Sequence, residues 1–317
     1  MRSETITRES SASALQVGRE LFLRAFLGGV SGGNAGASAR RLASRVSDLW
    51  LPEGKSLYEI GDPSEDHYFV VSGEIEIRGA AGESRRFGER SIVGLLDVSQ
   101  ERPRSRRAVA TAASHLLRLS AQDWYDTLED DFEFALGAIH GIGRGVFTSH
   151  LAHSGRFFNA LTTTTKPRKG ALSFVERTLL LRAAPPFRKA SVQAAVEVAG
   201  IARLVTRAAG EALFSAGDAK RSYYVVADGT VALVDDGRSI AEFHPGAVLG
   251  GLGALAAEPW PVMARAVNAA TVVAVELEDL FDVMEEHFDL VRGALSELAR
   301  EREQLATAGD EPPRPSP

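Results

Sequence analysis

The chain of 317 residues contains no cysteine, which excludes disulfide bonds and thiolate metal sites. It also has no secretory signal and no apolar run long enough to cross a bilayer, since its most apolar N-terminal stretch, 21–30, is short and contains Arg24. The net charge of -6 provides no general attraction for nucleic acid or for an anionic membrane. We therefore expect a cytoplasmic protein whose partners include neither nucleic acid nor a membrane.

What the chain does contain is an internal repeat. Four glycines recur 156 residues later: Gly54, Gly61, Gly73 and Gly94 return as Gly210, Gly217, Gly229 and Gly250. Hydrophobic residues make up 44% of the sequence, enough for two compact domains with a core each. The repeat therefore predicts one fold built twice.

Within each copy, short β-type runs punctuated by glycine are flanked by segments with helical periodicity. Many short strands at close spacing predict a β-roll or barrel. The expected fold is thus mixed α and β, with two tandem β-roll (jelly-roll-like) domains, each flanked by helices. We expect a disordered N-terminus over 1–13, a first domain over 14–160, a linker over 161–170, a second domain over 171–304, and a disordered Pro-rich tail over 305–317.

The glycine spacing comes with a specific motif. The first copy has Gly61-Asp62-Pro63 followed by Tyr68-Phe69-Val70-Val71-Ser72-Gly73, and the second has Gly217-Asp218 followed by Tyr223-Tyr224-Val225-Val226 and Gly229. This pattern resembles the cyclic-nucleotide-binding domain family, and the tandem arrangement is similar to that of the regulatory subunits of cAMP-dependent protein kinase. The resemblance implies a phosphate-binding cassette, Phe-Gly-Glu-Leu-Ala and then Pro-Arg-Ala. Its arginine neutralises the cyclic phosphate and its glutamate binds the ribose 2′-hydroxyl.

The first copy keeps part of that cassette. Leu95 stands at the glutamate position, so a buried 2′-hydroxyl would go unpaired at a cost of about 1–3 kcal/mol. Asp97 stands beside the expected phosphate, which is unfavourable unless Arg102, Arg106 or Arg107 neutralises it. The candidate ligand-binding residues are Gly94, Leu95, Leu96, Asp97, Arg104 and Ser105, with Arg104 at the position of the phosphate arginine.

The second cassette is more degenerate. Its residues are Gly250, Gly251, Gly253, Trp260 and Pro261. Gly251 replaces the glutamate, Trp260 replaces the arginine, and Pro261 has no N–H to offer a phosphate. Trp260 is either a core residue that fills the vacated pocket or an exposed anchor for a partner. We expect no cyclic nucleotide in this copy.

The sequence also predicts no enzyme. The seven histidines provide no His-x-His pair of the kind that a jelly-roll metal enzyme carries on a strand. No Ser-His-Asp spacing and no Gly-rich nucleotide loop with its lysine is present. We therefore predict no catalytic residues, no metal site and no cofactor, the candidate ligand being cAMP or cGMP in the first domain.

These patterns favour a regulatory protein. Only 288–304 follows the second roll before the Pro-rich tail, too little for a DNA-binding winged helix. We expect a non-enzymatic protein that acts on a protein partner, unidentified by sequence, and is gated by a ligand in the first domain. The alternative is a ligand-independent scaffold in which both pockets are degenerate. The sequence assigns no oligomeric state.

Overall fold

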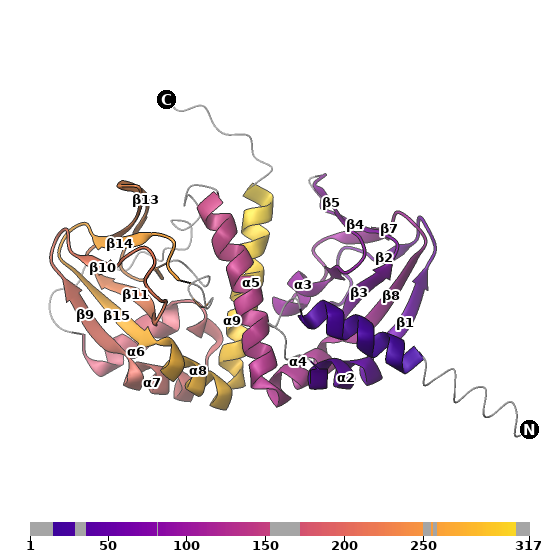
Figure 1. Cartoon of the computed structure of the whole chain (residues 1–317), viewed down its shortest axis with the longest axis horizontal. Coiled ribbons are helices and arrows are strands. Elements are labelled where there is room, and N and C mark those ends of the chain that lie inside the picture. The colour runs from indigo at the N-terminus through magenta and orange to yellow at the C-terminus, as the bar shows by residue number, and fades with distance from the viewer. Residues whose placement is uncertain are drawn as a thin grey trace, which may run out of the picture. The chain divides into compact units, whose positions relative to one another are not determined.

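The computed structural model describes residues 15–28, 36–80, 82–152, 172–249, 255 and 259–308 (Figure 1). The chain forms two compact units, Met1–Ala138 and Ile139–Pro317. The predicted N-terminal tail 1–13 and the predicted linker 161–170 lie outside the described residues, so those parts of the expected division stay predictions. Of the predicted tail 305–317, the described part (305–308) is helical.

The first unit is built from two antiparallel four-stranded sheets, ordered β1-β8-β3-β6 and β2-β7-β4-β5. After a helix over 15–28, its elements are α2 (Gly36–Arg45), β1 (Ser47–Leu51), β2 (Ser56–Tyr58), β3 (Asp66–Ser72), β4 (Ile75–Arg78), β5 (Ser84–Phe87), β6 (Ile92–Val93), α3 (Leu95–Ser99), β7 (Arg107–Ala110), β8 (Ser114–Ser120) and α4 (Ala121–Asp130). α5 (Phe132–Ala152) begins in this unit and continues into the next.

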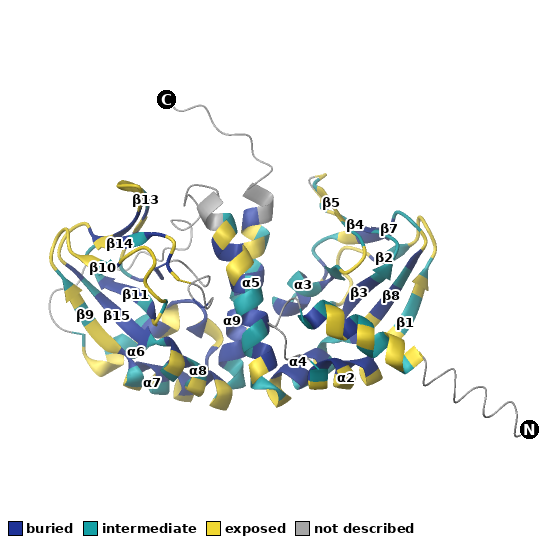
Figure 2. Cartoon of the chain, in the orientation of Figure 1, coloured by how far each residue is buried: buried dark blue, intermediate teal, exposed yellow. Residues whose placement is uncertain are grey.

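The core of the first unit lies between its two sheets. Tyr58 and Ile75 from one sheet pack in a single buried cluster with Tyr68 and Leu116 from the other. The hairpin strand β5 is mostly exposed (Figure 2). Burying one face of each sheet in this way closes the strands into a roll.

The second unit repeats this plan, with sheets ordered β11-β15-β9 and β10-β14-β12-β13. Its elements are α6 (Phe174–Ala183), a short 3-10 helix (Phe187–Lys189), α7 (Val192–Ile201), β9 (Arg203–Arg207), β10 (Ala212–Phe214), β11 (Ser222–Asp228), β12 (Val231–Asp235), β13 (Arg238–Phe243), β14 (Met263–Ala266), β15 (Ala270–Glu276), α8 (Leu277–Glu286) and α9 (Phe288–Ala308). The fold class expected from the sequence is confirmed.

The spacing of 156 residues holds for whole elements as well as for glycines. α2 and α7, β1 and β9, α4 and α8, and α5 and α9 all begin 156 residues apart. β9 begins at Arg203, directly after α7 ends at Ile201.

Two turn glycines show why the repeat keeps glycine at these positions. Gly73 and Gly229 have φ of 88° and 75°, in the left-handed region. A Cβ on Gly73 would stand 2.6 Å from Cα of Ser114, and a Cβ on Gly229 would stand 2.7 Å from Cα of Ala270. Only glycine fits either turn.

The helix that follows the first roll has a side-chain N-cap. Ser120 is the N-cap of α4, and its hydroxyl accepts a hydrogen bond from the backbone N–H of Asp123 at 3.0 Å. None of the described helices combines the length and the apolar character needed to span a membrane.

Candidate functional site

The first cassette is a tight turn followed by a short helix. Gly94 is the N-cap of α3 and has φ of 89°, a left-handed conformation. Leu95 and Leu96 form the first turn and are half-buried, whereas Asp97 is buried. Because α3 has only five residues, recognition of an anion at this turn depends on a charged side chain.

That side chain is Arg104, which is 2% exposed. Its guanidinium donates from Nη1 to the carbonyl of Gly94 at 2.9 Å and from Nη2 to the carbonyl of Asp66 at 2.6 Å. The guanidinium carbon stands 4.3 Å from the ring centroid of Tyr58, a cation–π contact. The structure therefore brings together the turn, β3 and the expected phosphate arginine.

The charge of Arg104 has no counter-ion within the part of the chain that the structure describes. The side chain forms no ion pair with a described carboxylate, and its buried Nε has no hydrogen-bond acceptor there. A buried cation is stable only when charge or polar groups compensate it. Two carbonyls, the ring of Tyr58 and a hydrogen bond with the side chain of Tyr68 do so here, and the N–H of Nε remains without an acceptor among the described residues.

Asp97 does not compensate Arg104, because it is engaged elsewhere. Its Oδ1 accepts hydrogen bonds from Nε of Arg102 and from the hydroxyl of Ser105, both at 2.8 Å. The backbone N–H of Ser105 donates to Oδ2 at 3.3 Å. The neutralising neighbour that the sequence required for Asp97 is thus Arg102.

The two other arginines of this segment also pair within the unit. Arg106 forms an ion pair with Glu83 at 3.8 Å, and Arg107 forms one with Glu59 at 3.2 Å. Each of these arginines therefore contacts a carboxylate, whereas Arg104 contacts none among the described residues.

Three residues around Arg104 were not identified from the sequence. Burial raises the pKa of Tyr58 and of Tyr68, while Arg104 acts in the opposite direction on both. His67 is completely buried, and neither ring nitrogen has a partner among the described residues. Burial, with a smaller contribution from the nearby charge of Arg104, lowers the pKa of His67 to about 3. The only available sequence signal was the aromatic pair Tyr58 and Tyr68, which returns as Phe214 and Tyr224.

The second cassette is described only in part, since Gly250, Gly251 and Gly253 lie outside the described residues. Pro261 is exposed. Trp260 is 1% exposed, and its ring stacks on Phe214 with centroids 4.0 Å apart and an interplanar angle of 12°. Of the two interpretations of Trp260, the structure favours the core residue over the exposed anchor.

Two further side chains, an aromatic ring and an ammonium group, contact the indole of Trp260. Phe147 meets it edge to face at 5.9 Å, and Nζ of Lys220 stands 5.0 Å from its ring centroid. An aromatic stack therefore occupies the position that corresponds to the guanidinium of Arg104.

These features define a protein of two tandem β-rolls, the first of which carries a cassette turn against its core. A model of the cyclic nucleotide-binding domain matches residues 49–131 and 204–287. The chain belongs to the cyclic nucleotide-binding domain family, in two tandem copies. Tandem domains of this kind support a regulatory role, and domains of this family are generally non-catalytic.

Several solved structures match this chain over most or part of its length. A segment of PfPKA-R with cAMP bound is 15% identical over 92% of each chain, with a TM-score of 0.38. The regulatory domain of Toxoplasma gondii PKA with cAMP is 16% identical over 90% of this chain and 97% of that one, with a TM-score of 0.34. A cyclic nucleotide-binding-like protein from Brucella abortus is 26% identical over 34% of this chain and 97% of that one, with a TM-score of 0.30. Comparison with curated proteins gives no match.

Proposed function

We propose that this chain is a non-enzymatic regulatory protein whose first domain senses a phosphate-bearing ligand, cAMP or cGMP, and which acts on a protein partner. The observation that carries the proposal is the buried guanidinium of Arg104, which has no counter-ion among the described residues. A cyclic phosphate would supply that charge and accept hydrogen bonds from the guanidinium.

The contacts of Arg104 also suggest how the binding of a ligand would affect α4. Nη2 of Arg104 donates to the carbonyl of Asp66, and the adjacent carbonyl of Glu65 accepts the backbone N–H of Ala121 at 2.7 Å. Ala121 is the first residue of α4. A ligand that drew Arg104 away from Asp66 would disturb the start of β3. The neighbouring hydrogen bond between Glu65 and the first residue of α4 would then be affected as well. The proposed output is a population shift in α4 and in the surface offered to a partner.

Isothermal titration of the full chain with cAMP and cGMP tests the sensing step. Binding should follow one site per chain, and Arg104→Gln should weaken it at least tenfold because the charge-assisted bonds are lost. Arg106→Gln is the matched control, since Arg106 pairs with Glu83 and should leave affinity unchanged. Absence of heat at millimolar concentrations of both nucleotides would contradict the proposal and favour the ligand-independent scaffold.

Leu95 provides a gain-of-function test of the same site. If the ligand lies as the family resemblance implies, Leu95→Glu adds the missing acceptor for the ribose 2′-hydroxyl. The gain should be roughly tenfold in affinity for cAMP. The increase should vanish for 2′-deoxy-cAMP, whereas an equal increase for both nucleotides would mean that the ribose lies elsewhere.

The scaffold alternative has its own support in the second domain. Trp260 and Phe214 fill the position corresponding to Arg104 with stacked rings. We therefore propose that the second domain contributes by contact alone, without a nucleotide.

A further inference from the structure

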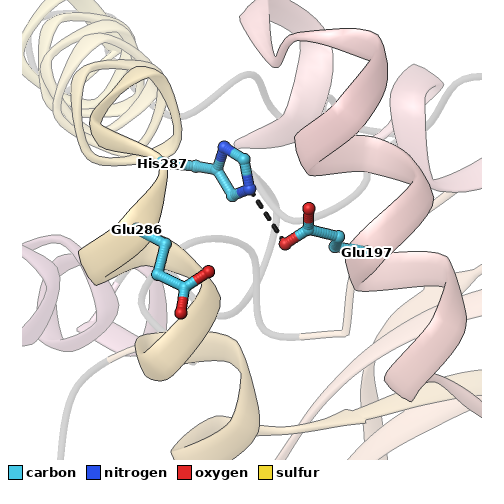
Figure 3. A group of neighbouring side chains, drawn as sticks. All are labelled: Glu197, Glu286 and His287. Atoms are coloured by element: carbon cyan, nitrogen blue, oxygen red, sulfur yellow. Dashed lines mark hydrogen bonds and ion pairs between the residues drawn. The ribbon is translucent and has the colours of Figure 1, made fainter.

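Three side chains with metal-ligand chemistry meet in the second unit, at α7 and the junction between α8 and α9 (Figure 3). Glu197 lies on α7, Glu286 is the last residue of α8, and His287 is the C-cap that precedes α9. One ligand atom from each lies within 4.8 Å of the others. Nε2 of His287 is 2.9 Å from Oε2 of Glu197. The sequence predicted no metal site because Glu197 and His287 are 90 residues apart.

The cluster contains two carboxylates and no basic side chain other than the imidazole. No described lysine or arginine forms an ion pair with Glu197 or Glu286. Nε2 of Gln193 donates a hydrogen bond to Oε1 of Glu197 at 3.1 Å. Two neighbouring carboxylates repel each other unless a cation lies between them.

The equivalent place in the first unit shows how such a junction is neutralised. At the repeat spacing of 156 residues, Arg41 corresponds to Glu197 and Asp130 corresponds to Glu286. Nη1 of Arg41 forms an ion pair with Asp130. The first unit thus supplies its own cation between the helices, whereas the second places a carboxylate at the same position. His287 in turn stands at the position of Asp131, so the second unit replaces an arginine and two carboxylates by an imidazole and two carboxylates, a donor set that suits a metal ion.

We propose that Glu197, Glu286 and His287 bind a divalent transition-metal cation of the Zn²⁺ class. Zn²⁺ accepts imidazole and carboxylate ligands at about 2.0–2.2 Å, and the exposed Glu286 can close the remaining gap by rotation of its side chain. Ca²⁺ and Mg²⁺ prefer sites made of oxygen alone, so the imidazole favours zinc over either. The hydrogen bond from Gln193 orients Glu197 for the ion.

The ion would join α7 to the turn between α8 and α9. Since these residues meet only in the folded unit, a cation bound there stabilises the native state. This site lies within the second unit and does not rest on the proposed sensing of a nucleotide by the first.

Titration of Zn²⁺ into the chelator-treated full chain tests the site by calorimetry and by thermal unfolding. One ion per chain should bind and raise the unfolding temperature. Glu286→Gln and His287→Ala should each weaken binding at least tenfold. Asp130→Asn, the equivalent change to Glu286→Gln in the first unit, is the matched control and should leave zinc affinity unchanged.

Glu286→Gln separates a metal site from a simple pair of side chains. Glu286 is exposed and takes no part in the hydrogen bond between His287 and Glu197, so the variant should fold as the wild type does by circular dichroism. Loss of the zinc-dependent rise in unfolding temperature in this folded variant supports the site. Undiminished zinc binding by Glu286→Gln, no binding up to millimolar zinc, or tighter binding of Mg²⁺ than of Zn²⁺ would each overturn it.

Discussion

Arg104 in the first unit and Trp260 in the second occupy the same backbone position with different side chains. In the first unit, N–H of Gly61 donates to the carbonyl of Arg104, whose own N–H donates to Asp62. In the second, N–H of Gly217 donates to Trp260, whose N–H donates to Asp218. The backbone hydrogen bonds at this position are therefore the same in both units, although the side chains differ.

The neighbours of these two residues are matched as well. The guanidinium of Arg104 stands 4.3 Å from the centroid of Tyr58, and the indole of Trp260 stands 4.0 Å from that of Phe214, 156 residues further on. An aromatic platform is thus common to both units. The first unit places a cation on this platform, which is the proposed anion site, whereas the second completes an aromatic stack.

Truncating the stack should have the largest effect on stability. Trp260→Ala removes a fully buried indole, and we expect a loss of about 3–5 kcal/mol from the second unit. The remaining tryptophans, Trp50 and Trp124, lie in the first unit. Their fluorescence would follow the first unit during urea unfolding, while circular dichroism follows both. A loss below 1 kcal/mol would show that the indole is not a packing element.

Removing the corresponding cation should cost somewhat less. Arg104→Ala leaves the carbonyls of Gly94 and Asp66 without their side-chain donor, which predicts a loss of about 2–4 kcal/mol from the first unit. Urea unfolding followed by tryptophan fluorescence measures it. If the variant is instead more stable than the wild type, burial of the charge outweighs its hydrogen bonds, as in a site kept for binding.

The two units should also differ in their response to acid. The folded first unit keeps His67 neutral down to its pKa of about 3, whereas the unfolded chain takes up a proton below about pH 6.5. Stability therefore falls as the pH drops from about 6.5 to about 3, by up to ~1.4 kcal/mol per pH unit from this residue. The equivalent residue of the second unit is Tyr223, whose pKa burial raises, so it adds nothing in this range.

The variant His67→Leu should remove that part of the pH dependence. Urea unfolding at pH 7, 5 and 4 gives the slope, and His244→Leu, which removes an exposed histidine from the second unit, is the control. An unchanged slope in His67→Leu would show that the buried ring does take up a proton in the folded protein.

The smallest expected effect concerns Asp97. Arg102→Ala removes a partly exposed ion pair but leaves the hydrogen bonds from Ser105, so we expect a loss of roughly 1 kcal/mol. Because the charge of Asp97 is then uncompensated near the site, affinity for an anionic ligand should also fall severalfold by calorimetry. Unchanged affinity would place the ligand away from Asp97.

Much of this comparison was available from the sequence alone. The spacing of 156 residues predicted two copies of a β-roll, and reading both cassettes at that spacing placed Arg104 opposite Trp260. These features depend on the local requirements of a turn. Where φ is positive and the backbone passes close to a neighbour, as at Gly73, only glycine fits. The spacing of such glycines can therefore be recognised in the sequence.

The tertiary structure alone decided what these side chains contact. Arg104 binds a carbonyl 38 residues away, Asp97 is neutralised by Arg102 and not by Arg106 or Arg107, and Glu197 meets His287 across 90 residues. Each contact joins strands or helices that are brought together only by burial of the core. A linear pattern fixes which residue types stand at a turn, but packing over long sequence distances determines which charges are compensated and which are not.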